Sequence, residues 1–420
     1  MRPGSAVGQR LVRGSVWVLA GRGFGVVVVL ATNALLTRLL SPDQVGAYFV
    51  VLSLVMFCAL LAQMGAERTA VRLVAESLGT GRPGRARAAI VSVAGIVGGG
   101  ALVVAILLVV TTTVRRICAE IFRGFSQIHL ATAFENLAAA GLTAVAFLLL
   151  WTLRHRVALR AVLVVSVAAS GAAAAWAVLL VLRRVRALGP RDRSLGPRAV
   201  FDISWPLLFV SLALFVLGAG VDVWILSAFR SSRDVALYGA AVRLVAVVGA
   251  PLTILLAVLQ PVIAELHARG ERALLERTLR NAATVAAVPS ALVVLVFLGF
   301  GGPVMARVFG PFYRHGSAVL AVLSLGQMAN VVAGACGAAL MMTGHQRTMM
   351  KITLCVAALS VTGGLVLVRP FGPVGVAAST AFAFTLQNVL MLGYAKRSLG
   401  IWTHVGIPRR RTRSASPDSA

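Results

Sequence analysis

Four ionisable side chains lie inside long apolar stretches of this sequence: Arg22, Glu135, Asp222 and Arg243. A charge in an apolar segment is costly to bury in a membrane, and it usually faces a water-filled cavity or a partner of opposite charge. Guanidinium groups bind phosphate through paired hydrogen bonds, whereas an intramembrane carboxylate can relay protons. These residue types predict an anion-binding cavity with a neighbouring site for proton or ion coupling.

Two of the apolar stretches carry polar residues at helical spacing. Ser15, Arg22 and Asn33 are 7 and 11 residues apart, which places them within about 20° of one another on a helix. A second stretch has a similar stripe, formed by Ser204, Ser211, Gly218 and Asp222. Small polar residues also pack membrane helices together, and this alternative stays open for Ser15 and Asn33. Arg22 lies about 12 Å along its helix, too deep to reach the membrane surface easily, so we expect it to line a cavity, with a structural ion pair as the alternative.

Asp222 and Arg243 fall at similar depths, about 12 and 14 Å from the shared end of two consecutive antiparallel helices. They are therefore candidates for a buried ion pair. If water reaches the pair, Asp222 would take up a proton and release Arg243 to phosphate. Asp222 and Glu135 are the candidates for proton or ion coupling, and Arg22, Asn33, Ser15 and Arg243 are the candidate substrate-binding residues.

The composition identifies the chain as a polytopic membrane protein. Of 420 residues, 59% are hydrophobic and only 13% are charged. A bilayer core needs about 20 apolar residues per helix, and eleven runs of that kind occur, whereas outer-membrane barrels use alternating strands of about ten residues. The runs lie near 14–36, 44–64, 88–112, 128–151, 157–182, 203–229, 235–262, 282–300, 317–343, 348–368 and 374–395.

The net charge of +27 comes from arginines gathered between the apolar runs. Cytoplasmic loops of membrane proteins carry such an excess, and no aromatic residues alternate with the arginines as they would in a nucleic-acid-binding surface. We therefore expect a multi-pass protein of the cytoplasmic membrane, with both termini cytoplasmic, the basic segments on anionic lipids and no nucleic-acid partner. The first run is too long for a cleaved signal peptide.

The chain divides into two related halves. "SPDQVGAYFVVLSLV" at 41–55 and "SSRDVALYGAAVRLV" at 231–245 match at five positions with an offset of 190. Internal duplication is a common way to build transporters, with the substrate site between the halves. The expected units are an N-terminal bundle at 1–182, a cytoplasmic linker rich in Arg, Gly and Pro at 183–202, a C-terminal bundle at 203–396 and a basic disordered tail at 397–420.

The number of helices in the first half is ambiguous. The second half has six apolar runs and the first has five, yet six would keep the arginine-rich linker in the cytoplasm. We expect segment 101–123 to contain a shortened or re-entrant fourth helix, with a deletion as the alternative. The total is then 11–12 transmembrane helices around a central cavity.

Motifs for catalysis or cofactor binding are missing from the sequence. The four cysteines are scattered, the six histidines form no HExxH motif, and no GxxxxGK[ST] phosphate loop occurs. We expect no metal, no cofactor and no enzymatic activity.

The first 76 residues resemble the oligosaccharide flippase family of the multidrug/oligosaccharidyl-lipid/polysaccharide (MOP) exporter superfamily. The resemblance rests on "GSVWVLAGRGFGVVVVLATNALLTRLLSPDQVGAYFVVLSLV" and "GAERTAVRLVAE", and in the second half on "VDVWILSAFRSSRDVALYGAAVRL" and "VLQPVIAEL". Asp222, Tyr238, Arg243 and Pro261 lie at matching places, and the resemblance departs at the fourth helix.

The resemblance implies a transporter that flips an undecaprenyl-diphosphate-linked oligosaccharide by alternating access, for cell-surface polysaccharide biosynthesis. Polysaccharide polymerases or glycosyltransferases of the same pathway would be its partners. A cation-coupled multidrug exporter would require carboxylates in the cavity, and only 13 acidic residues occur in the chain. A peptidoglycan-precursor flippase differs only in substrate and stays open. A membrane glycosyltransferase or polymerase is disfavoured, because no large extramembrane loop is present.

Overall fold

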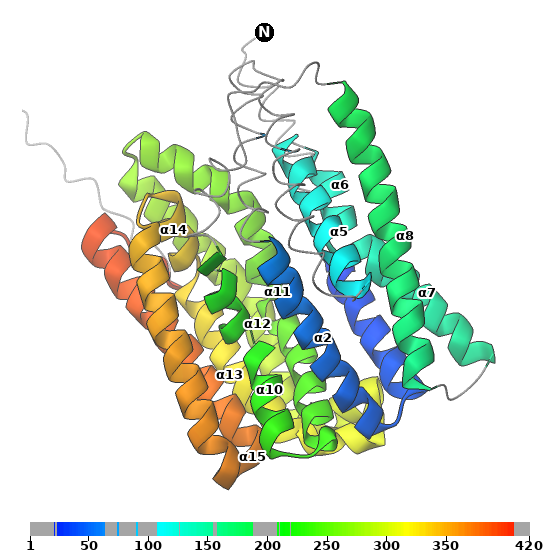
Figure 1. Ribbon diagram of the computed structural model, residues 1–420. Helices are drawn as coiled ribbons and strands as arrows, with labels where there is room; N and C mark the ends of the chain where they lie inside the picture. The colour runs from blue at the N-terminus through cyan, green and yellow to red at the C-terminus, as the bar shows by residue number, and fades with distance from the viewer. Residues whose placement is uncertain are drawn as a thin grey trace, which may run out of the picture.

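The computed structural model describes residues 21, 23–63, 74, 90, 107–125, 127–153, 158–187, 208–209, 211–218 and 220–406. Every regular element in these ranges is a helix (Figure 1). By length and composition, 6 described helices can cross a membrane, or 7 if the bent pair Ser211–Leu217 and Gly220–Phe229 forms one span. The predicted all-α polytopic fold is confirmed.

The first half contains a charged helix that hydropathy alone does not mark as a span. Its described helices are Gly23–Leu39, α2 (Pro42–Gln63), α5 (Leu107–Gly124), the continuous run of α6 (Ile128–Thr132), π-helix η1 (Ala133–Leu137) and α7 (Ala138–Leu153), and α8 (Leu159–Arg186). The shortened helix predicted within 101–123 is present as α5, with 18 residues against 22 in α2. It packs against α8 and α2. Four charged residues lower its hydropathy: Arg115, Arg116, Glu120 and Arg123.

The second half follows the predicted runs closely. It contains α10 (Gly220–Phe229), α11 (Ser232–Ala268), α12 (Arg272–Phe309), the 3-10 helix η2 (Pro311–Gly316), α13 (Ser317–Ala333), α14 (Cys336–Met342) and α15 (Gln346–Leu399). The long α15 consists of two arms that meet at Gly372, whose φ of 58° breaks the helix. Ser379 Oγ in the second arm donates to the Ser360 carbonyl in the first at 3.0 Å, so the arms lie side by side.

The predicted linker and the predicted tail both begin later in the structure than in the sequence analysis. Helix α8 continues to Arg186, so the start of the predicted linker 183–202 is helical. The tail predicted as disordered from 397 is ordered to Gly406: Thr403 Oγ1 donates to the Ala333 carbonyl at 2.8 Å, and the Gly406 amide donates to Thr284 Oγ1 at 3.2 Å. A backbone hydrogen bond to α13 and burial of Ile401 hold this segment on the bundle, which composition alone does not reveal.

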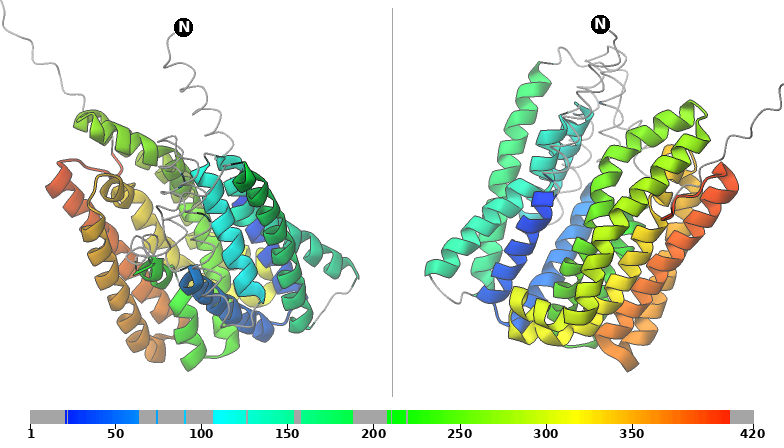
Figure 2. Two further views of the ribbon diagram at one scale, coloured as in Figure 1. Left: turned by 45° about the horizontal axis from the view of Figure 1, so that its top comes forward. Right: turned by 180° about the vertical axis from the view of Figure 1, so that it is seen from behind.

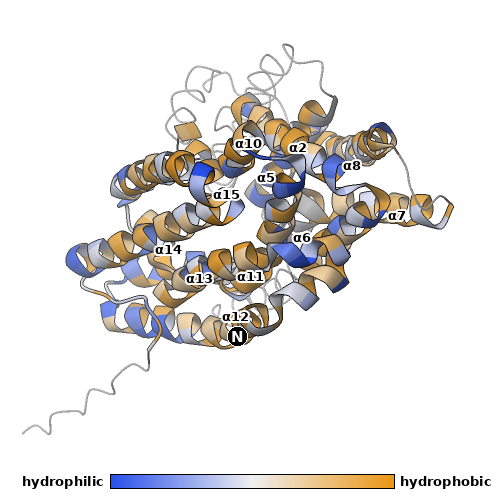
Figure 3. Cartoon of the chain, turned by 90° about the horizontal axis from the view of Figure 1, so that it is seen from below, coloured by the Kyte–Doolittle hydropathy of each residue, from blue (hydrophilic) through white to orange (hydrophobic). Residues whose placement is uncertain are grey.

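The surface of the helices is apolar over much of the periphery (Figure 3). Along α12, Val288, Leu292 and Leu295 are 65–69% exposed. Contiguous apolar exposure of this kind is costly in water and suits contact with lipid chains. The largest buried apolar cluster instead joins both halves, with Phe49 of α2 and Leu244 of α11 among its members.

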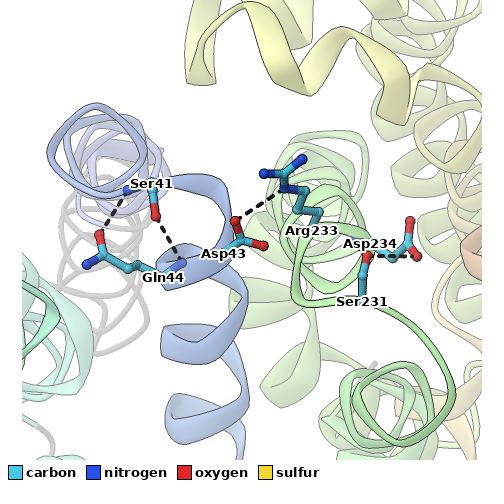
Figure 4. Close-up of polar contacts among 6 residues, drawn as sticks. All are labelled: Ser41, Asp43, Gln44, Ser231, Arg233 and Asp234. Atoms are coloured by element: carbon cyan, nitrogen blue, oxygen red, sulfur yellow. Dashed lines mark hydrogen bonds and ion pairs between the residues drawn. The ribbon is translucent and has the colours of Figure 1, made fainter.

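The halves lie side by side and meet where α2 and α11 begin (Figures 1 and 2). We call this the contact end. There Arg233 Nε lies 3.2 Å from Asp43 Oδ2, so one half is tied to the other by an exposed ion pair (Figure 4). Further along the same helices a Cβ on Gly46 would overlap the Ser232 carbonyl, and a Cβ on Gly239 would overlap the Phe49 ring. Close approach of α2 to α11 therefore depends on glycine at both sites.

Both helices at the contact end begin with the same kind of cap. Ser231 Oγ accepts from the Asp234 amide at 3.3 Å, and Ser41 Oγ accepts from the Gln44 amide at 3.4 Å (Figure 4). Serine at this position satisfies an amide that the first turn leaves unpaired. The repeated serine found in the sequence is thus a repeated helix start.

Candidate functional site

Arg243 lies in α11 between the two halves and is bound only by neutral groups among the described residues. Its Nε donates to Asn33 Oδ1 at 2.6 Å, and NH1 donates to the Gly239 carbonyl at 2.8 Å. The guanidinium carbon lies 3.8 Å from the centre of the Phe49 ring, a cation–π contact. These partners orient the arginine but do not cancel its charge.

Asp222 does not pair with Arg243, so the predicted ion pair is wrong. The carboxylate is 2% exposed and accepts hydrogen bonds from Tyr238 Oη and, at 2.8 Å, from Thr380 Oγ1. Tyr238 is completely buried. Asp222 therefore links α10 to α11 and α15 through hydroxyl donors and does not neutralise Arg243.

A bend in the helix that carries Asp222 separates it from the other residues of the predicted polar stripe. The helix axis turns by 53° between Leu217 and Gly220. Ser211 and Gly218 line a cavity, but Asp222 lies beyond the bend and is buried. The spacing of 7, 7 and 4 assumed a straight helix, and the fourth residue of the stripe, Ser204, lies outside the described residues.

Two cavities adjoin Arg243, and each is lined by both halves. The first, of about 600 Å³, lies among α2, α5, α10 and α11 and is called the α2-side cavity. The second, of about 640 Å³, lies among the segment 211–218, α11, α13 and α15 and is called the α13-side cavity. Helix Gly23–Leu39 borders both, and neither has a carboxylate among its described lining residues.

The α2-side cavity contains a second arginine, Arg116 of α5. This residue makes no hydrogen bond or ion pair with another described residue. Its neighbour Arg115 is buried and donates to the Phe134 carbonyl at 2.6 Å, which fixes α5 against the π-helix. Hydropathy did not identify Arg116 as a site residue, although two adjacent arginines inside a largely apolar segment were a visible signal.

The wall of the α2-side cavity is aromatic as well as cationic. Phe49 and Phe215 line it, and Phe215 also contacts Phe57 and Trp224 in a cluster that crosses between the halves. Trp224 Nε1 donates to Ser53 Oγ at 2.8 Å, joining α10 to α2. Aromatic faces beside guanidinium groups can hold a ligand that has both apolar and anionic parts.

The remaining predicted site residues are placed only in part. Asn33 lines the α2-side cavity and accepts a hydrogen bond from Arg243. Ser15 and Arg22 lie outside the described residues, although Gly21 and Gly25 on either side of Arg22 line the α13-side cavity. Glu135 lies on the π-helix η1, and its side chain is outside the described part of the structure.

Comparison with known sequences finds no matching protein-family model and no matching curated protein. Several solved structures nevertheless overlay on most of the chain. An inward-facing multidrug resistance MATE family transporter of the MOP superfamily matches with a TM-score of 0.70 and 14% identity, covering 92% of this chain and 98% of its own. An outward-facing transporter of the same description matches with a TM-score of 0.63 and 14% identity, covering 93% and 95%.

The lipid II flippase MurJ in an inward closed conformation overlays with a TM-score of 0.67 and 13% identity, covering 91% of this chain and 87% of its own. Identities of this size carry no information on substrate, but coverage of nearly the whole chain defines the architecture. The protein therefore has the two-bundle membrane fold of MOP-superfamily transporters.

Proposed function

We propose that this protein flips a lipid-linked oligosaccharide, carried on undecaprenyl diphosphate, across the cytoplasmic membrane by alternating access. One observation carries the proposal: Arg116 and Arg243, one from each half, line a single cavity that has no described carboxylate. An arginine inside a membrane protein needs an anionic partner or water. A diphosphate that enters between the halves would supply that partner.

The sign of the charge separates this proposal from export of cationic compounds. A cationic drug would require a carboxylate in the cavity, and the buried carboxylate among the described residues, Asp222, is held by Tyr238 and Thr380 instead. Asp222 fits better as a proton or ion coupling residue, since it joins three helices of one half. A peptidoglycan-precursor flippase shares the diphosphate and remains the alternative in substrate.

The conformation fits an inward-facing carrier. Described contacts between the halves run from the contact end to Phe57 in α2, and the overlay is better on an inward-facing MATE transporter than on an outward-facing one. At the opposite end, α8 finishes with Arg183, Arg184 and Arg186 (Figure 1). Basic residues favour the cytoplasm, so the contact end would face outward.

Export in a flippase-deficient host tests the role of the arginines. Arg243→Gln and Arg116→Gln should each lower export of the glycan at least tenfold at normal protein levels, and the lysine variants should keep part of the activity because they retain charge without paired donors. Arg269→Gln is a matched control, because Arg269 lies in the exposed turn after α11. Normal export by the double glutamine variant would refute the proposal. If cells with this variant accumulate peptidoglycan precursor instead of the lipid-linked glycan, the substrate is the peptidoglycan precursor.

A reporter fusion tests the orientation. Alkaline phosphatase fused at Gly189, in the predicted linker, should be inactive because an arginine-rich loop stays in the cytoplasm. A cytoplasmic reporter at the same position should be active. Phosphatase activity there would reverse the assignment of the contact end.

A further inference from the structure

We propose that the α13-side cavity binds the part of the substrate's isoprenoid chain that is nearest the diphosphate, while the α2-side cavity binds the sugar. This inference rests on the proposed function and adds a division of the substrate between two compartments that meet at Arg243. The lipid would thus be held partly inside the protein during transport, not only in the surrounding bilayer.

Arg243 marks the junction because it lines both cavities. Val242 and Ala246, one position before and one turn after it on α11, also line both. A diphosphate bound at Arg243 would therefore have one cavity on each side. In the proposed substrate the diphosphate joins the lipid chain to the sugar, which matches this arrangement.

The α13-side cavity has the surface expected for a hydrocarbon ligand. Most of its lining residues are aliphatic or glycine, including Val26, Leu30 and Ala250. Two of its hydroxyls are engaged within the protein: Thr253 Oγ1 donates to the Gly249 carbonyl at 3.0 Å, and Thr380 Oγ1 donates to Asp222. An apolar ligand leaves these groups satisfied, whereas a sugar would find few free partners there.

Glycines let the helices around this cavity pack closely, because a Cβ on Gly249 would overlap Gln327 and a Cβ on Gly326 would overlap Ala381. Five of them line it: Gly21, Gly25, Gly218, Gly249 and Gly326. A volume of about 640 Å³ suits a ligand of drug size, so it would enclose only the first units of a long chain. The remainder would extend into the bilayer.

The α2-side cavity differs in the groups that a sugar phosphate requires. It presents Arg116 in addition to Arg243, and the aromatic faces of Phe49 and Phe215. In contrast, the described lining of the α13-side cavity has Arg243 as its one cation and Phe384 as its one aromatic residue. The chemistry of the two linings therefore assigns the sugar to the α2-side cavity and the isoprenoid chain to the α13-side cavity.

Binding of two diphosphates to purified protein in nanodiscs of neutral phosphatidylcholine tests the division. Inorganic pyrophosphate has no chain, and farnesyl diphosphate adds fifteen carbons. Each buried methylene raises affinity about fourfold, so wild type should bind farnesyl diphosphate at least tenfold more tightly than pyrophosphate, after correction for partition into empty nanodiscs. Ala250→Phe and Val26→Phe, which fill the α13-side cavity from opposite halves, should reduce this ratio to threefold or less without weakening pyrophosphate binding.

The controls separate this inference from the proposed function. Val288→Phe adds the same ring at a lipid-facing site and should keep the wild-type ratio. Arg243→Gln should weaken both ligands about equally. If wild type binds both ligands with the same affinity, or if neither cavity-filling variant changes the ratio, the chain does not occupy this cavity, although the anion site stands. If wild type binds neither ligand, the anion site fails and this inference fails with it.

Discussion

Helices α2 and α11 occupy equivalent places in the two halves, yet the residues with which they meet are complementary, not identical. With the offset of 190, Asp43 corresponds to Arg233, Phe49 to Gly239 and Ser53 to Arg243. Asp43 pairs with Arg233, and Phe49 packs on Gly239, so these residues contact their own equivalents. Such contacts occur only close to the axis that relates two repeats.

Divergence of the two halves makes contacts between equivalent residues favourable. An identical pair on the axis would place like charges together or two rings in one volume. With Asp43 opposite Arg233 the two charges attract each other, and with Phe49 opposite Gly239 one ring fills the space that two rings could not share. The third pair has a different outcome: Ser53 offers no charge, and Arg243 forms no ion pair with a described residue.

The largest effect on stability is expected where the Phe49 ring packs on Gly239. Gly239→Phe should lower the free energy of unfolding by about 3 kcal/mol, because the new ring has no space beside Phe49. The exchange Phe49→Gly/Gly239→Phe should recover part of that loss by returning one ring to the same volume. Denaturation of the purified protein in detergent measures both changes.

A lipid-facing glycine provides the control for that pair. Nothing lies within 4 Å of a Cβ on Gly299, so Gly299→Phe should change the free energy of unfolding by less than about 0.5 kcal/mol. If the exchanged double variant were no more stable than Gly239→Phe alone, direct packing of the two positions on one axis would be disproved.

The equivalent tyrosines Tyr48 and Tyr238 should differ less strongly. Tyr238→Phe removes a donor to the buried carboxylate of Asp222 and should lower the free energy of unfolding by about 1.5–3 kcal/mol. Tyr48 is only half-buried, so Tyr48→Phe should lower it by at most about 1 kcal/mol. Equal losses in thermal or chemical unfolding would contradict the asymmetry between the halves.

The smallest effect is expected at the exposed charge pair. The side chains of Arg233 and Asp43 are 64% and 55% exposed, and such a pair contributes about 0.2–1 kcal/mol. Asp43→Arg should favour opening of the contact end and change the transport rate by a few-fold, whereas Asp43→Arg/Arg233→Asp should restore it. The effect should fade in 0.5 M salt, since exposed charges are screened; a salt-independent change would indicate another cause.

The sequence by itself determined most of the described helices, their approximate ends and the helix start that the two halves share. Apolar length and helical spacing are local properties, so the runs at 348–368 and 374–395 correspond to the arms of α15, and the repeated Ser41 and Ser231 mark two helix starts. The same reasoning recognised Arg243 as unusual, because a charge inside an apolar helix is visible in one dimension.

Only the tertiary structure decided the partners of the charged residues. Pairing depends on how each helix is rotated and bent relative to its neighbours, and the 53° bend before Gly220 removes Asp222 from the face that periodicity assigned to it. Arg116 and Arg243 are 127 residues apart in the sequence, counted as 243 minus 116, and they line one cavity only because α5 and α11 pack in different halves around it. Hydropathy reports how much a helix prefers the membrane, but the direction of a side chain within a bundle is set by the packing of all its neighbours.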